Sequence, residues 1–234
     1  MNQSSMKYVS NRDESDQVVP GHKYLVEWIR PFIRKSKILD IGCWTGPLET
    51  LLEKEDCKVS AIDIEEEPLV YARKRFPKMT FKQASLVEKL PFKKDEFDTV
   101  LYFMVIEHIP VGTEELAFQN INRVMKKNGN LFLSTMHSSI LSNLLDPAYF
   151  ITGHRHYSEE HLTRLLKKTG FQVKEVYFNG GWFTTLHIWM LYFFKHILRR
   201  KEPRGWFMDM LMAFDYRNRG FAEIEIRAVK KKDL

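Results

Sequence analysis

The residues best suited to bind a ligand lie between positions 37 and 47, where an apolar run ends in an acid and two glycines. Asp40, Gly42 and Gly46 stand there, with Cys43 and Trp44 between the glycines. Glycine adopts left-handed backbone angles and lets a ligand approach the main chain closely. A turn between a buried strand and a helix also offers free backbone N–H groups. We therefore expect a small-molecule site at this turn.

The glycine spacing separates three kinds of ligand. A dinucleotide turn requires three glycines, but Trp44 and Pro47 occupy the second and third of those positions. A phosphate loop requires a Gly-Lys-Ser/Thr ending, which the turn lacks. A methyl-donor nucleoside needs glycine only at the first and last positions, because it has no pyrophosphate to cradle. Asp63, at the end of the next predicted strand, is then placed to accept hydrogen bonds from both ribose hydroxyls.

The turn and the motifs after it resemble the class I S-adenosylmethionine-dependent methyltransferases, in the small-molecule branch known as type 11-like. The resemblance covers about residues 20 to 180 and the final strand. Its motifs are Asp40-Ile41-Gly42-Cys43-Trp44-Thr45-Gly46, Ala61-Ile62-Asp63-Ile64, Leu90-Pro91-Phe92 with Glu96-Phe97-Asp98, Ile106-Glu107-His108-Ile109, 123–130, Ser134-Thr135-Met136-His137 and Lys168-Thr169-Gly170-Phe171. Each motif is weak alone, and their shared order makes the resemblance specific.

The resemblance implies S-adenosylmethionine as donor, S-adenosylhomocysteine as product and a set of donor-binding residues. That set is Asp40, Gly42, Cys43, Trp44, Gly46, Asp63, Ile64, Ser85, Leu86 and Phe103. Trp44 replaces a glycine usual in the family, and its ring either lines the pocket or packs on the N-terminal helix. Ser85 and Leu86 stand where the family has an acid that binds the adenine amino group. Adenine would then rest on apolar contacts and backbone hydrogen bonds.

Histidines beside the predicted pocket are the candidates for catalysis. A hydroxyl acceptor requires a base, and histidine titrates near neutral pH. His108 follows the fourth predicted strand and His154 precedes a helix, and both are also compatible with a structural role. Candidates for acceptor binding are His22 and Tyr24 on the first helix, and Arg155 and Tyr157 beside His154. Arg155 would hold an anionic group of the substrate.

A metal site is the competing interpretation of the histidine-rich stretch. His154, His156 and His161 would supply three imidazoles, but the sequence shows no cysteine or acid at a convincing spacing. We therefore predict no metal site.

Strands and helices alternate along the chain, which predicts a doubly wound α/β sheet. The predicted strands span 38–41, 58–64, 79–83, 97–103, 130–135, 171–177 and 221–229. The predicted helices span 20–34, 48–53, 68–76, 113–127 and 158–170, with two more between 182 and 214. The resemblance implies seven strands in all, the last of them antiparallel. We expect a flexible N-terminus at 1–18 and one domain at 19–234, with a helical cap formed by 136–157 and the insert 182–214.

The insert carries an apolar helix over 182–198 whose orientation decides its role. Its polar residues are expected opposite the apolar face, and basic residues follow at 199–201. Such a helix either packs over the sheet edge or a dimer face, or lies on a membrane and reaches a lipid-linked acceptor. The possible membrane contact covers 182–201, and the chain is expected to be a monomer or a homodimer.

Composition and charge indicate the cellular compartment and the kinds of partner that the protein has. The chain has 234 residues and a net charge of +6, with basic residues gathered near 195–204 and 230–232. They form either a solvated face or a surface that attracts anionic partners. With only two cysteines, we expect both thiols to be reduced rather than joined in a disulfide. The sequence also predicts neither a signal peptide nor a membrane-spanning helix. These features predict a cytoplasmic protein. The Asn/Asp-Pro-Pro-Tyr/Phe motif is missing after the fourth predicted strand, so nucleic acid is not expected as the methyl acceptor.

The sequence thus predicts a methyltransferase that acts on a small-molecule or lipid-linked acceptor, at oxygen. A non-catalytic donor-binding scaffold of the same fold is the first alternative, because of Trp44 and the missing adenine acid. A nicotinamide oxidoreductase is the second, and the glycine spacing argues against it.

Overall fold

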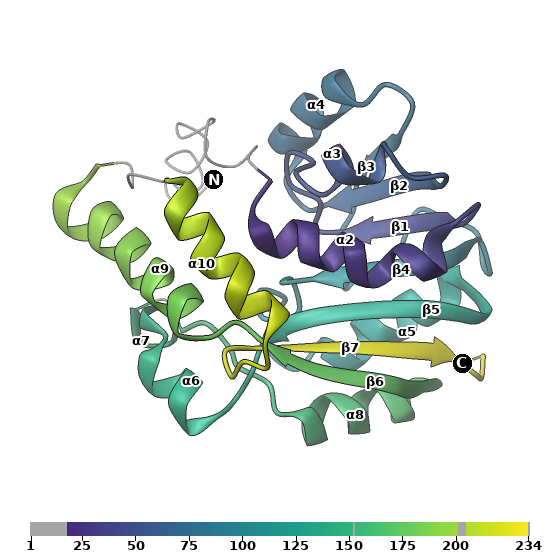
Figure 1. Cartoon of the computed structure of the whole chain (residues 1–234). Helices are drawn as coiled ribbons and strands as arrows, with labels where there is room; N and C mark the ends of the chain where they lie inside the picture. Colours follow the sequence, from purple (N-terminus) through teal and green to yellow (C-terminus); the bar gives the residue numbers. More distant parts are fainter. Residues whose placement is uncertain (1–17, 152, 201–204, 234) are drawn as a thin grey trace.

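A computed structural model describes residues 18–151, 153–200 and 205–233. Its strands form one seven-stranded sheet in the order β3-β2-β1-β4-β5-β7-β6 (Figure 1). The strands are β1 (Lys37–Ile41), β2 (Lys58–Asp63), β3 (Thr80–Gln83), β4 (Phe97–Phe103), β5 (Met125–Met136), β6 (Phe171–Asn179) and β7 (Glu223–Lys230). Only β7 runs antiparallel to its neighbours among these strands. The predicted doubly wound sheet with an antiparallel last strand is confirmed.

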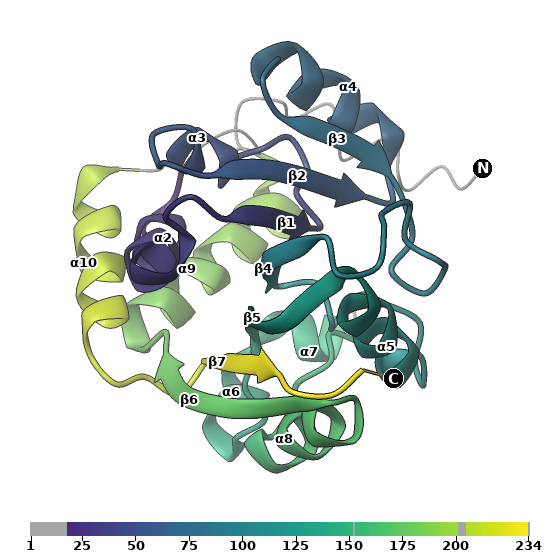
Figure 2. The ribbon, with the colours of Figure 1, turned by 90° about the vertical axis from the view of Figure 1, so that its right-hand side faces the viewer.

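Helices cover both faces of the sheet (Figure 2). The helices that alternate with the strands are α2 (Pro20–Ile33), α3 (Glu49–Leu52), α4 (Glu66–Arg75), α5 (Glu114–Val124) and α8 (Glu159–Lys168). One face packs against α2 and α3 through Ile29, Leu52 and Phe132. The other packs against α5 and α8 through Phe118 and Leu166. Both faces of the parallel strands are therefore buried, which explains their continuous apolar runs.

A helical cap stands at the carboxyl edge of the sheet (Figure 1). It consists of α6 (Ile140–Leu145), α7 (Pro147–Ile151), α9 (Trp182–Tyr192), the π-helix η2 (Phe193–Leu198) and α10 (Trp206–Arg217). The strand order reverses between β1 and β4, so the loops after these two strands diverge at the same edge. Ligands of open α/β sheets bind at such a point.

Several predicted element boundaries were wrong. The helix predicted over 113–127 ends at Val124, because Met125 pairs with Phe97 and starts β5. Helix α4 starts at Glu66, before Pro68, whereas α2 keeps its predicted span to within one residue. The helix predicted over 182–198 divides into α9 and η2. Residues 1–17 of the predicted flexible N-terminus, and the basic residues Lys201 and Arg204, lie outside the described residues.

Candidate active site

The glycine turn after β1 closes one side of a cavity of about 710 Å³. Gly42 has a φ of +80°, and a Cβ atom there would lie 2.3 Å from the Val105 side chain. Only glycine tolerates both that backbone angle and that close approach. The loop after β1 is thereby held against the loop after β4, which carries Val105 and His108.

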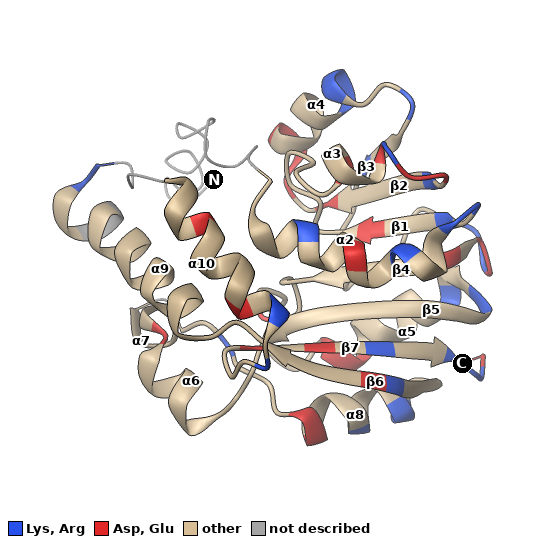
Figure 3. Cartoon of the chain, in the orientation of Figure 1, with Lys and Arg blue, Asp and Glu red and all other residues tan. Residues whose placement is uncertain are grey.

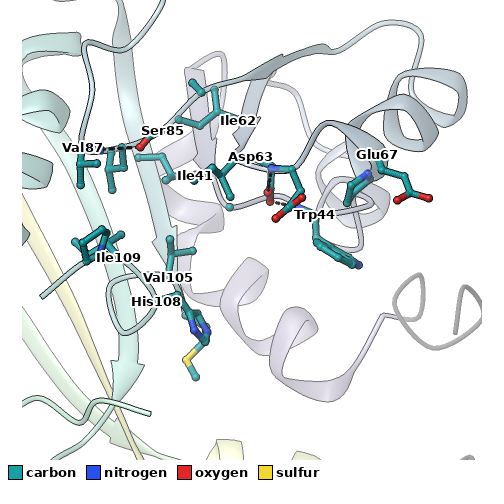
Figure 4. A pocket seen from close by; sticks show the side chains of 18 residues that line it. Ile41, Trp44, Ile62, Asp63, Glu67, Ser85, Val87, Val105, His108 and Ile109 are labelled. Atoms are coloured by element: carbon teal, nitrogen blue, oxygen red, sulfur yellow. Dashed lines mark hydrogen bonds between the residues drawn. The ribbon is translucent and has the colours of Figure 1, made fainter. Parts of the chain in front are cut away.

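Asp63, at the end of β2, fixes the same turn and faces the cavity (Figure 4). The backbone N–H of Trp44 donates to Asp63 Oδ2 over 2.8 Å, and that of Glu65 donates to Oδ1 over 3.0 Å. Each carboxylate oxygen has a further lone pair, so Asp63 can also accept bonds from a ligand hydroxyl. This is the position that the sequence predicted for the ribose acid.

The cavity fits a nucleoside with an amino-acid tail in size and chemistry. Six of the predicted donor residues line it: Gly42, Trp44, Asp63, Ile64, Ser85 and Leu86. Its volume is within the usual range for small-molecule pockets. The apolar side chains of Ile64 and Leu86 suit a base, while Asp63 suits a ribose. Of the two interpretations of Trp44, the one in which its ring lines the pocket is supported, and its φ of +50° places it in the left-handed region.

Four other predicted donor residues lie away from the cavity wall. Phe103 faces Trp28 of α2, with ring centroids 6.4 Å apart. The Cys43 side chain is buried against α4, and Gly46 is packed closely against Phe76. Asp40 lies behind the turn beside Glu49 of α3. Burial raises the pKa of Asp40 to about 7 and holds that of Glu49 well above its usual range. Asp40 is therefore one partner of a buried carboxyl pair beneath the turn, and its part in donor binding stays a prediction.

His108 and His154 come together at the rim of the cavity. His108 lines the donor cavity, and its Nε2 atom lies 3.5 Å from His154 Nε2. Burial, with the neighbouring His154 and Arg155, lowers the pKa of His108. A neutral imidazole at pH 7 can accept a proton, so the pair is suited to the predicted role of base.

Arg155 and Tyr157 serve to hold the loop that carries His108. The Arg155 guanidinium donates to the carbonyls of Ile106, Glu107 and Ile109 and pairs with Glu114. The Tyr157 hydroxyl donates over 3.1 Å to the Ile106 carbonyl and lies 3.1 Å from Glu114 Oε1. These groups are satisfied within the protein, and the substrate roles of both residues stay predictions.

The two acceptor candidates on α2 are also engaged in the fold. His22 Nδ1 accepts the backbone N–H of Val19 over 3.2 Å at the start of the helix. The Tyr24 ring stacks on Tyr216, and its hydroxyl accepts a bond from Asn179 over 3.0 Å. Neither residue lines the donor cavity.

Two acids near the histidines were missed by sequence reasoning. Glu107 is buried, accepts a bond from the Thr135 hydroxyl over 2.9 Å and has one oxygen without a hydrogen-bond partner. Burial raises its pKa to about 7. Asp146 lies between α6 and α7 and faces His154 and His156. Glu107 could have been found through its place in the Ile106-Glu107-His108-Ile109 motif, whereas no sequence signal marks Asp146.

The sequence profile of a family described as "Methyltransferase domain" matches residues 13–176, which is more than half of the chain. The chain belongs to the class I S-adenosylmethionine-dependent methyltransferases. This methyltransferase is similar to a "Probable S-adenosylmethionine-dependent methyltransferase" of Mycobacterium tuberculosis, with 28% identity over 64% of this chain and 54% of the relative. It is also similar to the "Ubiquinone biosynthesis O-methyltransferase" of Vibrio parahaemolyticus, with 29% identity over 47% of each chain. The methyltransferase thus spans about half the length of the curated relatives that it matches.

Solved structures show the same fold at low sequence identity. A methyltransferase from Archaeoglobus fulgidus has a TM-score of 0.67 and 17% identity, over 98% of this chain and 100% of that chain. A geranyl diphosphate methyltransferase in complex with its donor has a TM-score of 0.64 and 14% identity, over 90% and 84% of the two chains. The donor of the family is S-adenosylmethionine, and the cavity beside Asp63 is the place in this fold that suits it.

Proposed function

We propose that this methyltransferase transfers a methyl group from S-adenosylmethionine to an oxygen atom of a small-molecule or lipid-linked acceptor, at a membrane surface. The observation that carries the proposal is an exposed apolar cap over the carboxyl edge that holds the donor cavity. Relatives named as ubiquinone biosynthesis O-methyltransferases support oxygen as the acceptor atom.

The apolar face of α9 is turned outward. Trp182 is 62% exposed and Leu186 is 50% exposed, whereas Thr184 and His187, on the polar side, are buried at 3% and 9%. A helix that packs on a protein core shows the opposite arrangement. The exposed face is therefore suited to another apolar phase.

The neighbouring helices extend this apolar surface. The cap also carries many other exposed large apolar side chains. Together they are called here the apolar cap face: Ile140, Leu144, Tyr149, Phe150, Ile151, Trp182, Leu186, Trp189, Leu191, Phe193, Ile197, Leu198, Trp206, Phe207, Met210 and Phe214. Patches of this kind mark binding surfaces in soluble proteins. Arg199 and Arg200 are exposed at the end of η2, and most of the Lys, Arg, Asp and Glu residues lie in other elements (Figure 3).

A bilayer with anionic lipids is the partner that fits these features. Interfacial binding combines buried apolar and aromatic side chains with basic residues near the headgroups. No helix among the described residues is long and apolar enough to cross a membrane. The proposed contact is therefore peripheral, and a homodimer through the same face is the competing outcome.

The chemical step is a displacement at the methyl group of the donor. The donor supplies an electrophilic methyl group on a sulfonium; the acceptor oxygen forms a C–O bond as the C–S bond breaks. The hydroxyl proton passes to His108 at the cavity rim. Asp63 holds the donor, and the cap excludes water from the reacting atoms.

Liposome flotation tests the membrane contact. We expect the wild type to float with vesicles of phosphatidylcholine and phosphatidylglycerol, and Leu186→Glu with Ile197→Glu to remain in the dense fraction. The matched control is Val70→Glu with Leu116→Glu, because both residues are exposed apolar positions outside the cap. Equal flotation of all three proteins would end the membrane proposal, and wild-type protein that instead elutes as a dimer would favour the homodimer.

Turnover separates the enzyme from a scaffold. The assay supplies methyl-tritiated S-adenosylmethionine as the donor and a lipid extract of the organism that naturally contains the protein as the source of acceptor. We expect the label to appear in a product that partitions into the organic phase. Release of labelled methanol on alkaline hydrolysis would identify a methyl ester. Alkali-stable label that hydriodic acid releases as methyl iodide would identify an ether. Donor binding without transfer to lipid or aqueous extracts would favour the scaffold.

A further inference from the structure

We propose that Asp146, His154 and His156 form a binding site for a divalent transition metal ion of the Zn²⁺ class. One ligand atom from each residue lies within 4.8 Å of the others. Asp146 Oδ2 is 2.8 Å from His156 Nε2 and 3.7 Å from His154 Nδ1. Two imidazoles and a carboxylate are a ligand set that Zn²⁺ takes in proteins.

The three ligands come from two segments of the cap. Asp146 ends α6 and immediately precedes α7, and its Oδ1 atom accepts the backbone N–H of Ala148 over 2.8 Å. This bond leaves Oδ2 directed at the histidines. His154 and His156 stand two residues apart in the loop before α8, and such a spacing in extended chain puts both side chains on one side.

The hydrogen bonds of His156 indicate a cation beside its Nε2 atom. His156 Nδ1 lies 2.7 Å from Asn143 Oδ1, while the Asn143 amide nitrogen faces the Ser138 hydroxyl at 3.5 Å. Nδ1 therefore carries the proton in the neutral ring, and Nε2 has the lone pair. A lone pair 2.8 Å from a carboxylate oxygen requires a proton or a metal ion between them. Metal-bound histidines commonly have their second nitrogen fixed in this way.

His154 provides the second observation. Its Nδ1 atom is buried and has no hydrogen-bond partner within 3.5 Å, and the Asp146 carboxylate faces it at 3.7 Å. A buried polar atom without a hydrogen-bond partner needs an explanation, and a bound ion is one such explanation. Tetrahedral ligands at ordinary Zn²⁺ bond lengths lie about 3.3 Å apart. The observed 2.8 Å and 3.7 Å lie on either side of that spacing, so small side-chain movements suffice.

The two histidines of the site line a cavity, whereas Asp146 is not among the residues of that cavity wall. A second cavity, of about 720 Å³, is lined by both histidines together with Tyr149 and Gly153. Three protein ligands leave the fourth tetrahedral position to water. His161 also lines this cavity, but Asp146 takes the place that the sequence interpretation gave to it. The proposal replaces the sequence prediction that no metal site exists.

A second group of metal-binding side chains shares His154. Glu107, His108 and His154 also have ligand atoms within 4.8 Å of one another. We favour the first group because contacts with Asn143 and Ala148 already orient Asp146 and His156. A metal ion on His154 Nδ1 puts the proton on Nε2, which faces His108.

Metal binding is tested on the full chain, without a histidine tag and after treatment with EDTA, in the absence of donor and acceptor. We expect one Zn²⁺ per chain in calorimetry and intense visible absorption bands with Co²⁺, typical of four-coordinate sites. His156→Ala and Asp146→Asn are expected to raise the dissociation constant at least about tenfold. His161→Ala and His108→Ala are the matched controls and are expected to bind as the wild type.

The outcomes separate this proposal from its rivals. Absence of Zn²⁺ and Co²⁺ binding by the wild type would mean that a proton bridges His156 and Asp146, and would overturn the site. Binding lost in His108→Ala and retained in Asp146→Asn would place the ion at Glu107 instead. The Co²⁺ spectrum of the wild type tests the site even if the variants do not fold. Because no methyl transfer is measured, failure of the proposed function leaves this result unaffected.

Discussion

At the scale of single residues, Asp63 both stabilises the glycine turn and offers a carboxylate to a ligand in the cavity. Its two oxygens accept the backbone N–H groups of Trp44 and Glu65, so the carboxylate shapes the turn before any donor arrives. The remaining lone pairs face the cavity. Preorganisation of this kind reduces the ordering cost of binding.

We expect Asp63→Ala to weaken binding of S-adenosylhomocysteine by about 10- to 100-fold, because hydrogen bonds to a charged group are worth about 1.5 to 3 kcal/mol each. Trp44→Gly is the matched variant, since it removes a cavity wall and the left-handed strain at a φ of +50° while the main chain stays. It is expected to keep donor binding and to change acceptor preference. Calorimetry measures both variants, and unchanged affinity in Asp63→Ala would refute the ribose assignment.

Residue types predicted the parts of the site that follow from local spacing. Gly42 and Asp63 stand at the ends of β1 and β2, and parallel strands bring such ends together. Asp40 shares the same motif, but its partner Glu49 comes from the next helix, and a single sequence does not show that pairing. The contacts of Arg155 were not predicted for a related reason, because the carbonyls that it binds lie more than forty residues away in the chain.

At the scale of elements, α9 shows how an apolar helix is held with its apolar face outward. Asp215 of α10 accepts three hydrogen bonds through its Oδ2 atom, from the backbone N–H groups of Gly181 and Thr184 and from the Thr184 hydroxyl. A Cβ atom on Gly181 would lie 2.8 Å from Asp215 Oδ1, so glycine permits this approach. The carboxylate thus caps α9 from another helix and fixes its polar side inward.

We expect Asp215→Ala to loosen α9, because three buried donors lose their acceptor at about 1 to 3 kcal/mol each. Hydrogen exchange read by mass spectrometry should show faster exchange at 181–192, with β1 and β4 unchanged. Glu160→Ala is the control, since its pair with Arg164 is on the surface and worth little. Uniform acceleration throughout the sheet would instead mean that the cap and the sheet unfold together.

The apolar periodicity of 182–198 predicted the helix and its polar side, but the inward or outward direction of each side depends on Asp215 and on the neighbouring cap helices. The spacing of apolar residues shows only which side chains share one face of a helix. The surface against which that helix packs is a property of the tertiary structure, which explains why both orientations were left open from the sequence.

At the scale of the whole molecule, buried carboxyl groups gather along the carboxyl edge of the sheet. Asp40 and Glu49 lie beneath the glycine turn, and Glu223 and Glu225 stand at the start of β7, beside α2 and α10. Burial raises the pKa of Glu223 to about 7 and that of Glu225 to about 8. The same edge therefore carries the ligand sites and a set of carboxyls whose pKa burial raises.

These carboxyls should make the protein less stable as pH rises. Between the ordinary glutamate pKa of 4.5 and the raised value of about 8 for Glu225, the folded state holds a proton that the unfolded chain has released. The free energy of unfolding then falls with increasing pH, by up to about 1.4 kcal/mol per unit for each such group. We expect Glu225→Gln to remove one of these contributions, so that urea titrations between about pH 5 and pH 8 show a loss smaller by about 3 kcal/mol. Glu160→Gln, at an exposed position, should follow the wild type. Parallel profiles for wild type and Glu225→Gln would show that Glu225 is already ionised in the folded protein.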